Sequence, residues 1–141
     1  MKKMLKQLMG ALCVLLLASQ AWAGGGGYSS TAVGPNIYTK GYYNYAYFPP
    51  VGPIPAGSKI NYWVNWSWST SYTPPGLVTY LCYDSSLNKC LLLNTQSGST
   101  DYFNNMPAGN TFVFAQGVIG SGALYPVMYG NMDQVIVNFT Y

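Results

Sequence analysis

The stretch that decides the fold is Ile60-Asn61-Tyr62-Trp63-Val64-Asn65-Trp66-Ser67-Trp68-Ser69. Apolar residues occupy every second position, and polar residues fill most of the positions between them. A period of two places successive side chains on opposite faces of a β-strand, so the segment indicates a half-buried strand. The side chains predicted on its core face are Ile60, Tyr62, Val64, Trp66 and Trp68. Trp63 is the exception, because it stands among the polar residues of the other face.

Shorter alternating segments on both sides of this strand predict an all-β fold. The other segments expected as strands are 37–48 (one strand, or two split at Gly41), 77–82, 90–93, 101–104, 111–118, 124–129 and 135–141. Residues 95–100 are expected to be a turn, and no segment after residue 23 has helical periodicity. About 7–8 short strands separated by turns predict an antiparallel β-sandwich, or a small partly closed barrel.

The N-terminus has the features of a cleavable export signal. Three lysines lie within the first six residues, an apolar run covers residues 8–18, and Ala21-Trp22-Ala23 is a small-x-small cleavage site. The apolar run is shorter than the roughly 20 residues of a membrane-spanning helix. We therefore expect residues 1–23 to be removed as a signal peptide, with no membrane insertion afterwards.

The rest of the chain is expected to form one domain. Residues 24–32 begin with a run of glycines and are predicted to be a flexible leader. Residues 33–141 are predicted to form a single β-sandwich domain. Half of the chain is apolar and 16% is aromatic, which is enough for a packed core.

The mature part of the chain carries few charges, and they balance because half of the lysines leave with the signal. The charged residues that remain are Lys40, Lys59, Lys89, Asp84, Asp101 and Asp133. No basic patch is left for nucleic acid. All three aspartates lie beside turn residues, where aspartate commonly hydrogen-bonds its own backbone. We therefore expect structural roles for them.

The chain contains no histidine, glutamate or arginine. Histidine is the commonest general base near neutral pH, and glutamate is the usual acid of raised pKa. Arginine is the usual clamp for phosphate. Three scattered aspartates without histidine make no metal cluster. The composition therefore predicts a protein that binds another molecule and is not an enzyme, with no catalytic residue, cofactor or metal.

Two cysteines, Cys82 and Cys90, remain after signal removal. An even pair in an oxidising compartment favours a disulfide. The two residues flank a short polar segment between strand-like runs, which predicts a hairpin whose strands are linked near the turn. A redox-active pair would have Cys-x-x-Cys spacing, and this pair does not.

Aromatic side chains form the candidate binding surface. Trp63 lies on the polar face of its strand, and Tyr43, Tyr45 and Tyr47 alternate along the preceding tyrosine-rich segment. Aromatic faces on a rigid sandwich can stack on a sugar, and exposed aromatic residues mark protein interfaces as readily. The tyrosines could instead cover a neighbouring strand, so a structural role stays open for them.

Several motifs from residue 64 to the C-terminus resemble the FlhE family of flagellar proteins. The matching pieces are Val64-x-Trp66-x-Trp68, Thr73-Pro74-Pro75-Gly76-Leu77, Leu81-Cys82 followed by Cys90, Gln96-Ser97-Gly98-Ser99-Thr100, Met106-Pro107-Ala108 and Gln134-Val135-Ile136-Val137-Asn138-Phe139. The resemblance implies a small accessory protein of the periplasm without catalytic residues. It also implies contact with a flagellar export or basal-body protein, which restrains proton leakage through the export apparatus or assists assembly.

Two other functions stay open. A carbohydrate-binding sandwich would use Trp63 and the tyrosines as a platform for a glycan. A pilus-like subunit would account for the alternating terminal strand that ends in Tyr141. The neighbouring genes would discriminate between a flagellar and a polysaccharide setting.

Overall fold

The computed structural model describes residues 23–141, and the predicted signal peptide lies outside them except for Ala23. The strands of this part are β1 Gly25–Val33, β2 Ile37–Thr39, β3 Tyr43–Phe48, β4 Lys59–Ser67, β5 Leu77–Tyr83, β6 Lys89–Leu92, β7 Ser97–Thr100, β8 Phe112–Val118, β9 Ala123–Met128 and β10 Met132–Thr140. All their pairings are antiparallel, which confirms the all-β prediction. No helix in the described residues is long and apolar enough to cross a membrane.

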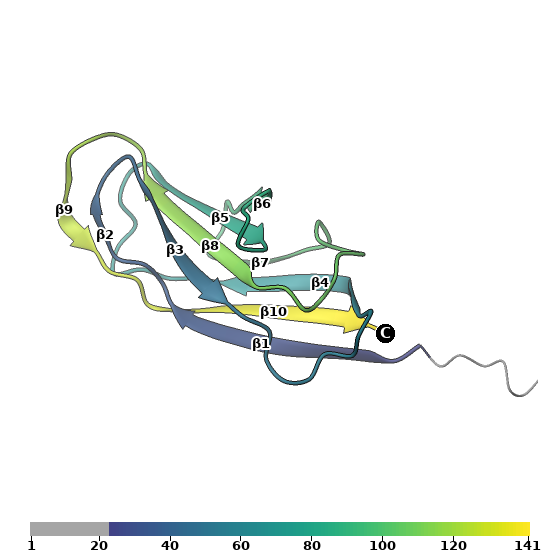
Figure 1. The fold of residues 1–141 in the computed structure, drawn as a ribbon. Helices are drawn as coiled ribbons and strands as arrows, with labels where there is room; N and C mark the ends of the chain where they lie inside the picture. Colours follow the sequence, from purple (N-terminus) through teal and green to yellow (C-terminus); the bar gives the residue numbers. More distant parts are fainter. Residues whose placement is uncertain (1–22) are drawn as a thin grey trace, which may run out of the picture.

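Two four-stranded sheets form the sandwich (Figure 1). The first sheet has the strand order β1-β10-β4-β7, and the second has the order β3-β8-β5-β6. A two-stranded ribbon of β2 and β9 lies at one end of the sandwich. Neither four-stranded sheet closes on itself, so the sandwich form of the prediction is right and the barrel form is not. The expected strand at residues 37–48 is split into β2 and β3 around Gly41, which has a φ of 86°.

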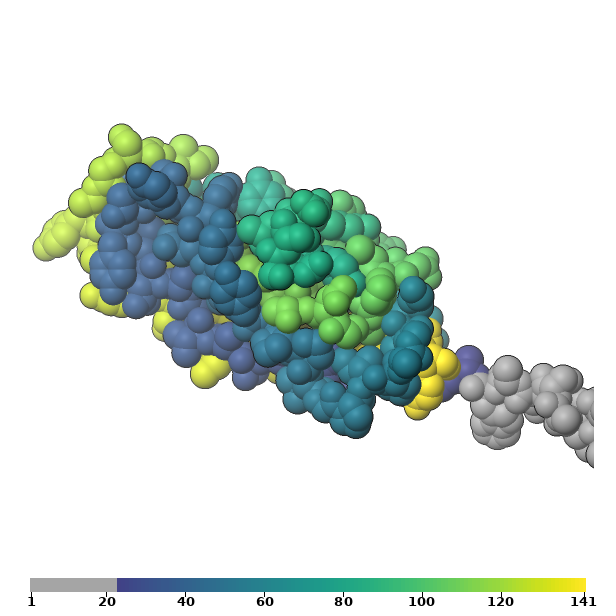
Figure 2. All heavy atoms as spheres, in the orientation of Figure 1, coloured from purple at the N-terminus to yellow at the C-terminus, as the bar shows by residue number. Residues whose placement is uncertain are grey.

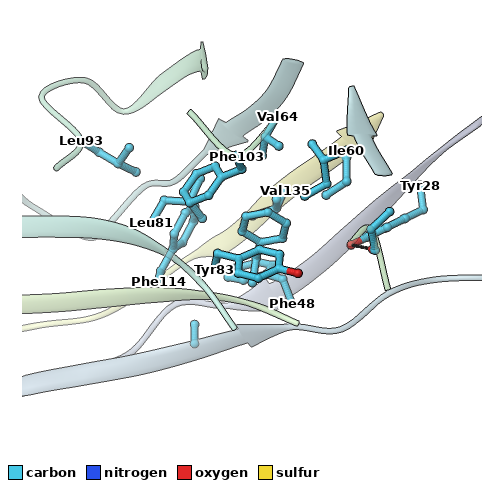
Figure 3. Packing of buried hydrophobic residues seen from close by; sticks show 14 of the residues in the cluster. Tyr28, Phe48, Ile60, Val64, Leu81, Tyr83, Leu93, Phe103, Phe114 and Val135 are labelled. Atoms are coloured by element: carbon cyan, nitrogen blue, oxygen red, sulfur yellow. Dashed lines mark hydrogen bonds between the residues drawn. The ribbon is translucent and has the colours of Figure 1, made fainter. Parts of the chain in front are cut away.

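The core lies between the two sheets and consists of their inward-facing side chains (Figure 3). Val64 and Val135 come from the first sheet, and Phe48 and Phe114 come from the second. The rings of Phe48 and Phe114 meet edge to face, with centroids 4.8 Å apart. Full burial of side chains of this size contributes roughly 1.5–3 kcal/mol each. The alternation read from the sequence is therefore the source of this core.

The prediction that residues 24–32 form a flexible leader is wrong, because nearly all of them belong to β1. This strand pairs with β10 in one continuous register, from Gly25 opposite Thr140 to Val33 opposite Met132. The glycines leave room for aromatic rings of β10: a Cβ atom on Gly26 would lie 2.8 Å from the ring of Phe139. Glycine in a strand often marks such a close approach. The folded domain therefore starts at the glycine run and not at residue 33.

β4 departs from strict alternation at Tyr62, which was predicted in the core and is 64% exposed. Ile60 and Val64 are both fully buried and are separated by three residues along β4, but their partners on β10 are separated by a single residue. The two additional residues form a bulge, in which Tyr62 takes a φ of 65°. The bulge turns Tyr62 out of the core and restores the alternation at Val64. Trp63 is 52% exposed, as predicted.

Three smaller predictions also change. The expected turn at residues 95–100 contains β7, which pairs with β4 at the edge of the first sheet. The expected strand at residues 101–104 is a turn, in which the Asn104 N–H donates to the Asp101 carbonyl at 3.0 Å. Trp66 is only partly buried, whereas Trp68 is buried as expected. β7 is polar throughout, so it carries no alternating signal.

Candidate functional site

The three predicted tyrosines lie in a row on the outer face of the second sheet. Along β3, Tyr43, Tyr45 and Tyr47 are 50%, 41% and 54% exposed, whereas Ala46 and Phe48 point into the core and are buried. A strand with its inner face in the core must present the alternate residues to the outside. The structure therefore brings these three predicted residues together.

The neighbouring strand β8 is buried on both of its faces. Its inward side chains belong to the core, and its outward residues Val113 and Ala115 are 0% and 6% exposed. In the register of the sheet, Ala115 lies between Tyr45 of β3 and Tyr80 of β5. Taller side chains on both flanking strands thus stand over a floor of small residues. We call this surface the aromatic groove, formed by Tyr43, Tyr45, Tyr80, Leu87, Ala115 and Gly117.

Two shallow depressions lie along the aromatic groove. One has a volume of about 250 Å³ around Gly117, and the other has a volume of about 200 Å³ around Ala115. Tyr43 lines both, and its ring meets that of Tyr80 edge to face with centroids 6.1 Å apart. A Cβ atom on Gly117 would lie 2.8 Å from the Tyr42 carbonyl oxygen, so a larger residue would not fit at this position without a shift of the backbone.

The disulfide between Cys82 and Cys90 forms one wall of the second depression. The sulfur atoms are bonded at 2.04 Å, and the two cysteines are direct partners across β5 and β6, as predicted. Leu87 from the connecting turn lines the same depression. In Figure 2, β3 (blue) and this hairpin (green) adjoin on one face of the molecule.

The aromatic groove is neutral. No charged side chain lines either depression, and the polar side-chain atoms there are tyrosine hydroxyls. Desolvation, together with the neighbouring Tyr80, raises the pKa of Tyr43 above its usual value, so this hydroxyl stays protonated. Such a surface can bind an apolar or aromatic partner, and it offers no general base or nucleophile.

Trp63 lies on the other side of the molecule from the tyrosines. It belongs to the first sheet, where the inward-facing Val64 follows it directly. Its backbone carbonyl accepts a hydrogen bond from Asn138 Nδ2 at 2.7 Å, which holds the bulge of β4 against β10. The four predicted binding residues therefore form two separate surfaces and not one platform.

Sequence reasoning missed Tyr80, Leu87 and Ala115 as members of the aromatic groove. Tyr80 alternates with the buried Leu81, so the same period of two that found the β3 tyrosines could have found it. Leu87 lies in a turn and has no such signal. Its position follows from the disulfide-linked hairpin alone.

The three aspartates do not come together. Within residues 23–141 no group of three histidine, cysteine, aspartate or glutamate residues is arranged to hold a metal ion. Asp84 and Asp101 lie in turns, as predicted. Asp133 does not: it is 1% exposed and points inward from β10. The prediction of a turn role for Asp133 was wrong, because the strand begins one residue before it.

Comparison with known proteins identifies the family. The model of the family "Flagellar protein FlhE" matches residues 34–140. Flagellar protein FlhE of Salmonella typhimurium is 32% identical over 130 residues, which cover 92% of this chain and 95% of that protein. Flagellar protein FlhE of Escherichia coli is 37% identical over 67 residues, which cover 48% of this chain and 49% of that protein.

A solved structure has the same fold. The crystal structure of FlhE superposes with a TM-score of 0.73 and 29% sequence identity, covering 82% of this chain and 97% of that one. Sequence and fold thus agree over nearly the whole of the described domain. The chain belongs to the FlhE family of flagellar proteins.

Proposed function

We propose that this chain is a non-catalytic accessory protein of the bacterial flagellar export and assembly system that acts by contact with another protein. Its export signal supports a location in the periplasm. The partner would be a flagellar export or basal-body protein, and the contact would restrain proton leakage through the export apparatus. Membership of the FlhE family supports the flagellar setting.

The observation that carries the proposal is the aromatic groove. Solvent-facing tyrosines are enriched at protein interfaces, because each gives a large, rigid apolar area and a hydroxyl for hydrogen bonding. A contiguous exposed apolar surface on a soluble domain commonly marks a binding site. Here Tyr43, Tyr45 and Tyr80 border two depressions that apolar side chains of a partner can fill.

A glycan is the second candidate ligand, because Tyr43, Tyr45 and Tyr47 stand in a row. A sugar site also needs several polar side chains that bind hydroxyl groups. The depressions offer tyrosine hydroxyls and no amide, carboxylate or cationic side chain. The lining therefore favours a protein partner. A pilus-like subunit is less favoured, since β10 already has a neighbouring strand on each side.

The test is complementation of a strain that lacks the gene for this chain. The double variant Tyr45→Ala and Tyr80→Ala should fold but fail to restore swarming and the resting cytoplasmic pH. It should also lose at least about tenfold in affinity for a flagellar basal-body fraction, since buried interface tyrosines often contribute more than 1.4 kcal/mol. The matched control is Tyr125→Ala, which removes a tyrosine that is 94% exposed on the ribbon.

Full complementation by the folded double variant would contradict the proposal. Retention of the wild-type protein on a polysaccharide column, lost in the double variant, would favour the glycan instead. If Tyr125→Ala fails to complement the strain and the double variant succeeds, the partner contacts the ribbon and not the aromatic groove.

A further inference from the structure

The ribbon of β2 and β9 is attached to the first sheet by three segments that meet at the start of β10, at the left of Figure 1. We call these segments, residues 34–36, 69–71 and 130–133, the joint. The Gly34 N–H donates to the Asn131 carbonyl at 2.8 Å, and the Asn131 N–H donates to the Ser69 carbonyl at 3.1 Å. Because β2 follows the joint and β9 precedes it, the joint holds the ribbon on the first sheet, while Val118 of β8 packs with the ribbon on the side of the second sheet.

Asp133 is buried inside the joint. Its Oδ1 atom accepts a hydrogen bond from the Ser69 N–H at 3.1 Å. Its Oδ2 atom is buried and has no hydrogen-bond partner among the described residues. The backbone closes tightly around this oxygen, since a Cβ atom on Gly34 would lie 2.6 Å from it. One carboxylate oxygen is therefore left unpaired in the centre of the attachment.

No charged side chain faces Asp133 from the segments packed against it. Strand β1, the other residues of the joint and residues 67–68 contain no lysine or further aspartate. The titratable side chains on or beside these segments are Tyr28, Tyr72 and Tyr129, and Tyr28 donates its hydroxyl to the distant Ala108 carbonyl. An ionised Asp133 is thus held by one hydrogen bond and no cation, which is an unfavourable state for a buried charge.

The neutral acid fits the same place better. Protonation turns Oδ2 into a donor, and the Asn131 carbonyl oxygen lines the same space, 3.4 Å from the position of the Gly34 Cβ. That carbonyl accepts one bond from Gly34 and has a second lone pair free for a donor. When Asp133 is ionised, neither of its carboxylate oxygens can donate a hydrogen bond to this carbonyl. Desolvation accordingly raises the pKa of Asp133 to about 6, against the lowering effect of the Ser69 N–H.

We propose that Asp133 is a proton-dependent switch that closes the joint when it is protonated and loosens the joint when it is ionised. Loosening weakens the attachment of the ribbon to the first sheet, and the ribbon carries Tyr38 and Tyr125, which are 57% and 94% exposed. The switch couples the surrounding pH to the way this end of the molecule is presented. It rests on the joint and is independent of the flagellar role.

The direction of the effect follows from linkage. The closed joint binds the proton more tightly than an open joint, in which Asp133 has its ordinary pKa near 4. Closure is therefore strongest below about pH 4, weakens as the pH rises from about 4 to about 6, and changes little above that range.

The first experiment is a carbon-13 NMR titration of the side-chain carboxyl groups in the purified protein. The chain has three aspartates and no glutamate, so the spectrum is simple. The Asp133 resonance should titrate with a midpoint near pH 6. A midpoint near 4 would overturn the proposal, and the measurement is made on the wild-type protein alone.

The second experiment is amide hydrogen exchange in β2 and β9, compared between the wild type and Asp133→Asn. Comparison at equal pH cancels the intrinsic pH dependence of exchange. Asparagine keeps the acceptor for Ser69 and can donate to Asn131 at every pH. The wild-type ribbon should exchange at about the rate of the variant at pH 4 and faster at pH 7.5, by up to about a hundredfold, which corresponds to two pH units of proton affinity.

The matched control is Asp101→Asn, which removes an exposed aspartate in a turn. It should follow the wild type at both pH values. If the ratio between the wild type and Asp133→Asn is the same at pH 4 and pH 7.5, Asp133 has a purely structural role and the switch is refuted. Faster exchange that is confined to β3 or β8 would equally refute it, because those strands do not pass through the joint.

Discussion

The outer faces of the two sheets differ in chemistry, although the strands of both sheets follow the same alternation of inward and outward residues. On the first sheet, outward polar side chains bond one another: Gln134 Nε2 donates to Ser29 Oγ, and the Ser99 hydroxyl donates to Asn65 Oδ1, each at 2.6 Å. On the second sheet, the outward side chains of β8 are apolar and buried beneath tyrosines of the flanking strands. The outward polar side chains of the first sheet are thus hydrogen-bonded to one another. The outer face of the second sheet is only partly covered.

This difference shows where a partner can gain binding energy. When a partner covers a polar face whose side chains are already hydrogen-bonded, the face loses its solvation, and the gain in binding free energy is small. When a partner covers an apolar face with open depressions, the binding free energy becomes more favourable with each unit of apolar area that is removed from water. The alternation of each strand is therefore insufficient to locate a binding surface, and the chemistry of the outward residues decides it.

The largest effect should come from β8, which separates the core from the aromatic groove. Phe114→Ala should cost about 3–5 kcal/mol of unfolding free energy, because it empties a fully buried core site. Val113→Ala on the opposite face should still cost about 1–3 kcal/mol, since Val113 is buried as well. Urea denaturation measures both. A Val113→Ala protein as stable as one with the surface change Asn65→Ala would show that the outer face of the second sheet is not a packed layer.

Removal of the disulfide should have the next largest effect. Replacing Cys82 and Cys90 by alanine should lower the unfolding free energy by roughly 2–3 kcal/mol, because the bridge closes a short loop in the unfolded chain. It should also release Leu87 from the wall of the aromatic groove. Thermal unfolding with and without a reductant measures the first effect. An unchanged melting temperature would mean that the hairpin is held by its other contacts alone.

The buried acid of the first sheet should make stability depend on pH. Because the folded protein holds the Asp133 proton up to about pH 6, the unfolding free energy should fall as the pH rises from about 4 to about 6. The loss should be about 1–3 kcal/mol, and Asp133→Asn should abolish it. Urea midpoints at a series of pH values measure the slope. Rising stability over this range in the wild type, absent in the variant, would reverse our assignment.

The smallest effect should come from Trp63 on the outer side of the first sheet. Trp63→Ala should change the unfolding free energy by no more than about 0.5 kcal/mol, as most exposed substitutions do. Trp68→Ala in the same segment should cost several times more, because Trp68 is buried. Trp66→Ala should fall between them, since Trp66 is partly buried against the core. Equal losses for Trp63 and Trp68 would mean that the bulge does not separate the faces.

Much of the fold could be predicted from local pattern. The alternation from Ile60 to Trp68, the terminal alternating run and the pair Cys82 and Cys90 predicted strands, faces and the linked hairpin correctly. The exceptions have causes that the pattern does not contain. Tyr62 leaves the core because three residues of β4 lie opposite a single residue of β10. β7 has no apolar residue that would distinguish it from a turn.

The candidate site was predictable only in part. Tyr43, Tyr45 and Tyr47 share a face because they are spaced by two along one strand, and the sequence shows that spacing. Whether Trp63 joins them depends on which sheet each strand enters. Sheet membership is set by pairing between distant segments, and no spacing along the chain encodes it directly.

By itself the sequence determined the all-β class, the faces of the alternating strands and the absence of the usual catalytic side chains, because these depend on residue type and on a period of two. Tertiary structure alone decided the remainder. The glycine run became strand β1 because Phe139, more than a hundred residues later, fills the space above Gly26. Asp133 became a buried acid because Gly34 and Ser69 close around it. Both outcomes depend on segments that meet only when the chain is folded.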